Sequence, residues 1–167
     1  MSALIQSLFR YKAWANAELF AALKVLDPIQ YQDELHSAIR ILNHIYVVDR
    51  IFVANLQQTT HAYTATNTPE TPTLEDLHQA VTETDGWYIA YVDKISPESL
   101  SESIRFSFVD GDLGHMTREE MLAHIVTHGG YHRGAVGRIL AQLSIAPPRD
   151  IYTKFLHDTE LHRRKDD

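Results

Sequence analysis

The segment HIVTHGGYHRGAV, residues 124–136, carries histidines with the spacing of metal ligands on a helix. His124, His128 and His132 stand four residues apart. On a helix that separation is a rotation of about 40° and a rise of about 6 Å, so each neighbouring pair can reach one ion. His124 and His132 are about 12 Å apart along the axis, too far to share metal–nitrogen bonds of about 2.1 Å. The spacing therefore predicts that one pair binds an ion, and it leaves open which pair.

A third ligand must come from another element, and His44 is the best candidate. It lies in AIRILNHIYVVDRIF, on an apolar ridge made by Ile41, Val48 and Ile51. A buried imidazole without a partner costs about 1–3 kcal/mol, which a metal bond at one nitrogen and a hydrogen bond at the other would remove. The alternative is a core histidine bonded only to protein. The neighbouring Asp49 and Arg50 could be a carboxylate that supports His44 and its partner, but we favour a plain surface ion pair.

Three histidines on one ion leave coordination positions for water or substrate. A bound water or thiol would then ionise near neutral pH. The chain has no cysteine, so thiolate ligands, disulfides and a cysteine nucleophile are excluded. A di-iron bundle would need two Glu-x-x-His elements, and the sequence has one, Glu75-x-x-His78. The spacing thus predicts a mononuclear site.

Composition restricts the partners. The 167 residues include 22 Asp and Glu against 15 Lys and Arg, giving a net charge of −7. An acidic surface repels phosphate backbones, so we expect no nucleic-acid partner. No apolar run approaches the length that spans a membrane and no signal peptide is visible, so we expect a cytoplasmic protein without membrane association.

Helical periodicity dominates the elements that must position these histidines. Helices are predicted over about residues 2–26, 37–57, 73–95 and 117–143, the last opened by the capping box Thr117-Arg-Glu-Glu120. Residues 59–72 are polar and predict a long connection. In 97–116, period-two alternation around Asp110-Gly111 predicts a small hairpin or an irregular excursion. A short C-terminal helix follows Pro147-Pro148.

These elements predict an all-α fold, a four-helix bundle with one long crossover connection and a small excursion before the last long helix. Residues 1–160 would form a single domain and residues 161–167 a polar tail. Gly130, Gly134 and Gly137 recur along one side of the last long helix. Because glycine costs about 1 kcal/mol in a helix, we interpret this strip as the site of close approach by another helix.

Three segments resemble the signatures of the DinB-like (YfiT-like) metal-binding four-helix bundle family: YKAWANAELFAAL, LNHIYVVDRIF and HIVTHGGYHRGAVGRIL. The resemblance covers nearly the whole chain. It implies that His44, His128 and His132 bind one divalent ion. Because imidazole suits several first-row metals, we expect zinc or nickel first, with iron or manganese possible. The resemblance does not imply a ligand role for His124. Tyr11, Trp14, Ala15 and Asn16 match the first-helix signature, for which we infer a structural role.

The resemblance also implies a function. Related members are thiol-dependent transferases or isomerases that use low-molecular-weight thiols such as bacillithiol or mycothiol. We therefore expect a metal-dependent hydrolase or thiol S-transferase acting on a small molecule. The alternative is a non-catalytic helical interaction or stress-response protein. A homodimer is expected, both from the resemblance and from aromatic residues on more than one side of the first two helices: Phe9, Phe20, Tyr46 and Phe52.

Overall fold

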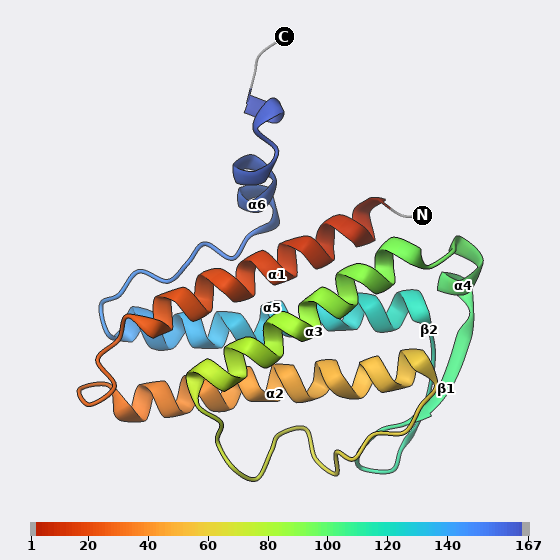
Figure 1. Cartoon of the computed structure of the whole chain (residues 1–167), viewed down its shortest axis with the longest axis horizontal. Helices are drawn as coiled ribbons and strands as arrows, with labels where there is room; N and C mark the ends of the chain where they lie inside the picture. The colour runs from red at the N-terminus through yellow and green to blue at the C-terminus, as the bar shows by residue number, and fades with distance from the viewer. Residues whose placement is uncertain (1–2, 165–167) are drawn as a thin grey trace.

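The computed structural model describes residues 3–164. Four long helices make up most of the fold: α1 (Ala3–Lys24), α2 (Gln32–Gln57), α3 (Leu74–Lys94) and α5 (Arg118–Gln142). α1 and α2 each contact both α3 and α5, which makes a bundle (Figure 1). α1 and α5 run in one direction and α2 and α3 in the other, so residues 58–73 must return the chain along the bundle between α2 and α3. The predicted mainly helical fold with a long crossover is confirmed.

Capping explains where the helices begin. The Thr117 side chain accepts a hydrogen bond from the backbone N–H of Glu120, whose side chain accepts one from the Thr117 N–H, so the predicted capping box is present. Thr73 caps α3 on one side only, because its side chain accepts a hydrogen bond from the backbone N–H of Asp76. The predicted start of α2 near residue 37 is wrong. The helix begins at Gln32, where acidic residues in the first turn complement the helix dipole.

The excursion before α5 is a short helix followed by a hairpin. α4 (Pro97–Ser101) leads into β1 (Ser103–Ser107), which pairs antiparallel with β2 (Leu113–Thr117). Ile104 and Phe106 point into the core, as the alternating pattern predicts. Gly114 lies opposite Phe106, and a Cβ there would come within 2.3 Å of the Phe106 ring. The hairpin thus packs an aromatic ring where any other residue would clash.

The core forms two clusters, one at the hairpin end of the bundle and one at the end where α1 passes into α2. Phe9, Phe20 and Phe52 are buried in these clusters, with at most 5% of each residue exposed. They serve the interior of one chain, so these three residues do not support the expected homodimer, which stays a prediction. Among residues 3–164, no helix is long and apolar enough to cross a membrane.

The glycine strip of α5 does not receive another helix, contrary to the sequence interpretation. Among residues 3–164, a Cβ on Gly134 would meet nothing within 4 Å, and one on Gly137 would meet the Pro147 side chain at 3.4 Å. The strip faces a cavity of about 320 Å³, which Ala15 and Leu19 of α1 and the connection after α5 also line. The sequence shows that small residues recur here, but the neighbour is an irregular segment whose path carries no periodic signal.

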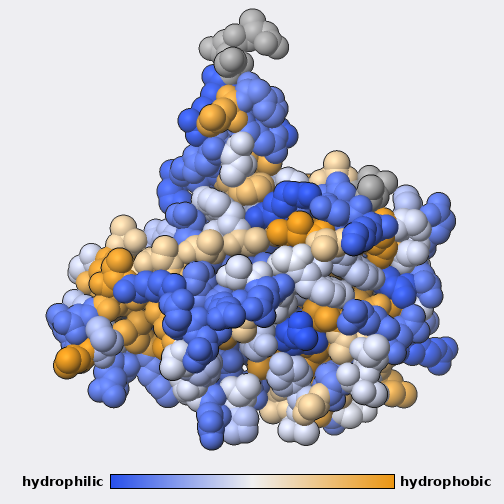
Figure 2. All heavy atoms as spheres, in the orientation of Figure 1, coloured by the Kyte–Doolittle hydropathy of each residue, from blue (hydrophilic) through white to orange (hydrophobic). Residues whose placement is uncertain are grey.

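After α5 the chain turns back over α1 and ends in α6 (Tyr152–Thr159) and the 3₁₀ helix η1 (Leu161–Arg164). Tyr152 donates a hydrogen bond to Ser7 Oγ at 2.8 Å, and Phe155 is buried beside Tyr11 and Trp14. Beyond this contact the segment projects from the bundle with a mainly hydrophilic surface (Figures 1 and 2). Residues 165–167 of the predicted polar tail lie outside the described residues.

Candidate metal centre

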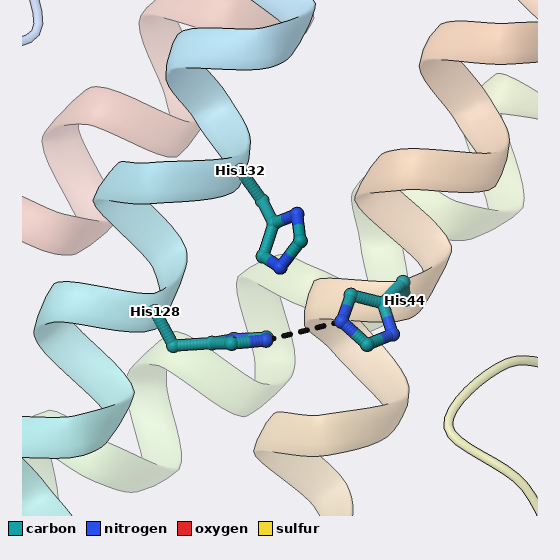
Figure 3. Close-up of side chains that lie close together, drawn as sticks. All are labelled: His44, His128 and His132. Carbon is teal, nitrogen blue, oxygen red and sulfur yellow. Dashed lines mark hydrogen bonds between the residues drawn. The ribbon is translucent and has the colours of Figure 1, made fainter.

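His44, His128 and His132 meet between α2 and α5. One nitrogen from each ring lies within 4.8 Å of the others, and no other group of three or more His, Asp and Glu side chains with this geometry occurs within residues 3–164. His128 and His132 project from successive turns of α5, and His44 faces them from α2 (Figure 3). The helical spacing of four residues and the packing of α2 on α5 therefore produce a cluster that could hold a metal ion.

The ring of His44 is oriented by the crossover connection. Its Nδ1 lies 2.7 Å from the backbone carbonyl oxygen of Thr66. Because a carbonyl oxygen can only accept, the hydrogen must be on Nδ1, and Nε2 keeps a free lone pair. That Nε2 lies 3.1 Å from Nε2 of His128. The polar connection, which carries no motif in the sequence, thus fixes the tautomer of His44 that a metal ligand requires.

Burial keeps the rings on α5 neutral. Burial, and secondarily the neighbouring rings of His132 and His44, lower the pKa of His128 to about 3. Burial and His44 also lower the pKa of His132. Nδ1 of His128 is buried and has no hydrogen-bond partner among residues 3–164. Neutral imidazoles are the form that binds metals, so the environment favours ligation over protonation.

The separation between the facing nitrogens of His44 and His128 suits a first-row metal ion. Two bonds of about 2.05 Å at a tetrahedral angle place their nitrogens about 3.3 Å apart. The Nε2 atoms of His44 and His128 are 3.1 Å apart. Neutral imidazole is an acceptable ligand for zinc, nickel, iron and copper alike. The donor set therefore fits a divalent ion and does not select one.

His124 does not belong to the cluster. Its ring lies one helical turn before His128, with 5.2 Å between ring centroids, and contacts the Phe52 ring in a tilted arrangement at 4.9 Å. Burial lowers its pKa. Spacing alone leaves either histidine pair open, and the structure brings the pair His128 and His132 to His44. Glu75 and His78 are also elsewhere: Glu75 pairs with Lys24, and His78 stacks on Phe20.

A buried ionic network lies beside the cluster, and the sequence reasoning missed it. Lys12 is fully buried, and its Nζ lies 2.7 Å from Asp49 Oδ2 and 2.6 Å from Asp85 Oδ1. Asn16 donates a hydrogen bond to Asp85 Oδ2 at 2.7 Å. Asp49 is therefore not part of a surface pair with Arg50. Their positions along the helix could have predicted this burial, because Lys12 and Asn16 fall on the buried stripe of α1.

The ionisation of this network follows from burial and pairing. Burial raises the pKa of Asp49 to about 6, against the opposing effect of Lys12. Burial lowers the pKa of Lys12, but the two carboxylates more than offset this and raise it overall. Oδ1 of Asp49 has no hydrogen-bond partner within residues 3–164. The ammonium group of Lys12 therefore compensates the charge of two buried carboxylates, Asp49 and Asp85.

Arg133 extends the network to the segment after α5. Its Nη1 donates to Asn16 Oδ1 at 3.2 Å, and its Nε donates to Asp150 Oδ2 at 2.7 Å. Tyr11 donates to the other oxygen of Asp150. Gly129 makes room for these groups, since a Cβ there would lie 3.0 Å from Arg133 Nη1 and 3.7 Å from Lys12 Cε. The residues of the first-helix signature thus serve packing beneath the histidine cluster.

The fold and the cluster together define a class of protein: a mainly helical bundle, with a small hairpin before its last long helix, that presents three histidines from two facing helices. The chain belongs to the DinB family, whose model matches residues 1–165. It is similar to the Protein DinB of Bacillus subtilis (strain 168), 27% identical over 176 residues that span 98% of this chain and 99% of that protein.

A solved structure shares the fold. The crystal structure of a DinB-like protein from Bacillus cereus ATCC 10987 aligns with a TM-score of 0.61 at 14% sequence identity, covering 84% of this chain and 93% of that one. The fold is therefore shared with a solved DinB-like protein.

Proposed function

We propose that the protein binds one divalent ion through His44, His128 and His132 and acts as a metal-dependent hydrolase or thiol S-transferase on a small molecule. One observation carries the proposal: three histidine nitrogens converge within 4.8 Å of one another, from two helices, in a partly buried site. Zinc and nickel are the preferred ions, with iron and manganese next.

The residues around the cluster hold the three histidine rings in the orientation and protonation state that a metal ligand requires. The Thr66 carbonyl directs the free lone pair of His44 at His128. Burial keeps the rings of His128 and His132 unprotonated. A bound ion would supply Lewis acidity that ionises a coordinated water or thiol near neutral pH. The chain has no cysteine to act as a nucleophile, so the attacking group would come from water or from the substrate thiol.

The metal site is tested by titrating chelated, untagged protein with zinc and nickel. We expect His44→Ala, His128→Ala and His132→Ala each to weaken binding on the order of a hundred-fold or more, because even residues that merely support ligands change affinity by about 10–100-fold. His124→Ala is the matched control, a histidine one turn away on the same helix, and should stay within a few-fold of wild type. Metal loss in His124→Ala with tight binding in the other three would refute the ligand assignment.

Catalysis is tested separately on the loaded protein. A panel of activated esters reports hydrolysis, and low-molecular-weight thiols offered with an aryl halide report thiol transfer. We expect metal-dependent turnover in one of these assays, lost in His132→Ala and kept in His124→Ala. Tight metal binding without turnover across both panels would favour the non-catalytic role.

A further inference from the structure

An apolar pocket opens directly beside the histidine cluster. It has a volume of about 200 Å³, and His44 and His128 form part of its wall. Most of the remaining wall is apolar and comes from α2 and the hairpin: Val48, Ile51, Phe52, Phe108 and Val109. A group held in this inner pocket would lie against two of the three proposed ligands. Its lining favours a compact apolar group there.

A second, larger pocket continues from the first. Its volume is about 570 Å³, and it is lined by residues that follow α2 and by the edge of β1. Four residues line both pockets: Asn55, Ser107, Phe108 and Val109. The shared wall makes the two pockets neighbours, with the inner one at the cluster and the outer one towards the hairpin. A molecule larger than the inner pocket would therefore extend into the outer one.

The chemistry of the outer pocket favours an anion. The chain has 22 Asp and Glu, yet no carboxylate of residues 3–164 lines either pocket. Arg105 lines the outer pocket, and within residues 3–164 its guanidinium has no hydrogen-bond or ion-pair partner. In a protein of net charge −7, this leaves an unneutralised cation facing an otherwise neutral polar pocket.

A buried donor stands at the junction of the two pockets. Asn55 is 8% exposed, and its Nδ2 has no hydrogen-bond partner among residues 3–164. Leaving a buried amide donor unpaired costs about 1–3 kcal/mol, so an acceptor on a ligand would recover that energy. Nδ1 of His61, which lines the outer pocket, is also buried and has no hydrogen-bond partner in the described part of the chain. The nitrogen atoms of Asn55, His61 and Arg105 can each donate a hydrogen bond, and such donors recognise a carboxylate.

We propose that these two pockets are the substrate site, and that the substrate carries a compact apolar group beside the ion and a carboxylate that binds Asn55 and Arg105. This inference rests on the proposed metal function and specifies its substrate class. Arg105 and Asn55 are specificity residues, because they contact the far part of the substrate and not the reacting atoms.

The test uses the full chain loaded with cobalt(II), whose absorption reports coordination of a thiolate. The probes are ω-mercaptocarboxylic acids and the ω-mercaptoalcohols of the same chain lengths. At the best length, we expect the acid to bind about ten-fold more tightly than the alcohol, as a charge-assisted hydrogen bond provides. Arg105→Gln should remove most of that preference.

Arg138→Gln is the matched control, since Arg138 is also exposed and without a partner among residues 3–164, but lines a different cavity, beside Pro147 and Pro148. It changes the net charge equally and should leave the preference intact. Ser107→Trp should obstruct the junction and weaken the longer thiols about ten-fold or more, while hydrosulfide, which needs only the ion, binds as before.

The outcomes separate the two proposals. Failure of wild type to take up cobalt would refute the proposed metal site, and this inference with it. If cobalt binds, three results would overturn the substrate site alone: acids that bind no better than alcohols, equal effects of the two arginine substitutions, or unchanged binding of long thiols in Ser107→Trp.

Discussion

Replacing Lys12 with methionine tests how much of the stability of the fold depends on the buried network. Lys12 is the one cation within ion-pair distance of Asp49 and Asp85 among residues 3–164. Methionine has a similar length and shape, so the substitution leaves little cavity and isolates the loss of charge. In the variant, Asp85 keeps its hydrogen bond from Asn16, whereas neither oxygen of Asp49 has a described side-chain partner.

The expected cost is large because the acids that remain are buried. Breaking a buried ion pair by removing one partner costs about 3–5 kcal/mol. A domain of this kind has a total stability of about 5–15 kcal/mol. The cost should also depend on pH. The folded-state pKa of Asp49 is already raised to about 6, and loss of Lys12 raises it further. A raised carboxyl pKa means that the folded state gains protons as the pH falls, so the deficit should shrink in acid.

Urea unfolding of the chelated protein, followed by far-ultraviolet circular dichroism, measures the difference. Lys24→Met is the matched control, because Lys24 pairs with the exposed Glu75 at 2.9 Å on the surface. Such pairs contribute about 1 kcal/mol or less. A Lys12→Met variant as stable as Lys24→Met would refute the reasoning. Adding Asp49→Asn and Asp85→Asn to Lys12→Met should recover part of the loss.

Three further outcomes are expected. Because the pKa values of His128 and His132 are depressed, the protein should retain the ion below about pH 6, where free imidazole is protonated. Elemental analysis after stepwise acid dialysis measures how much metal is retained. A release midpoint above pH ~6 contradicts this prediction. The same depression should make the metal-free fold less stable as the pH falls from about 6.5 to about 3, since only the unfolded chain takes up that proton. Gly134→Ala should raise stability by about 1 kcal/mol, whereas Gly129→Ala should not, because its Cβ would crowd Arg133; equal melting temperatures for the two variants would refute this. We also propose a homodimer, and one candidate surface is the exposed apolar end of the bundle where α1 passes into α2 (Figure 2). Sedimentation that finds only a 19.1 kDa species at micromolar concentration would exclude the dimer.

Features that depend on local spacing could be predicted from the sequence. The capping box at Thr117, the turn at Asp110-Gly111 and the alternation around Phe106 depend on neighbours within a few residues, and the structure has each of them. The turn-by-turn relation of His128 and His132 is local in the same way. The choice between the two histidine pairs was not local, because it depends on where α2 places His44.

Features that depend on long-range contacts could not be predicted. Asp49 has the appearance of a surface residue next to Arg50, yet it is buried because Lys12, on another helix, comes to it. The crossover connection shows no motif, but the Thr66 carbonyl orients His44. Both cases involve groups brought together by tertiary packing, about which residue periodicity carries no information.

The separation of the ligands along the chain has a consequence for when an ion can be acquired. His44 and His128 are 84 residues apart, and they come together only when α2 has docked on α5. Before that docking, the histidine pair of α5 lacks its third partner, and two rings hold an ion far more weakly than three converging rings. Under the proposed function, the metal would therefore be selected by the folded protein. The nascent chain would have no competent site during synthesis, and the bound ion would be set by the metals available to the folded protein.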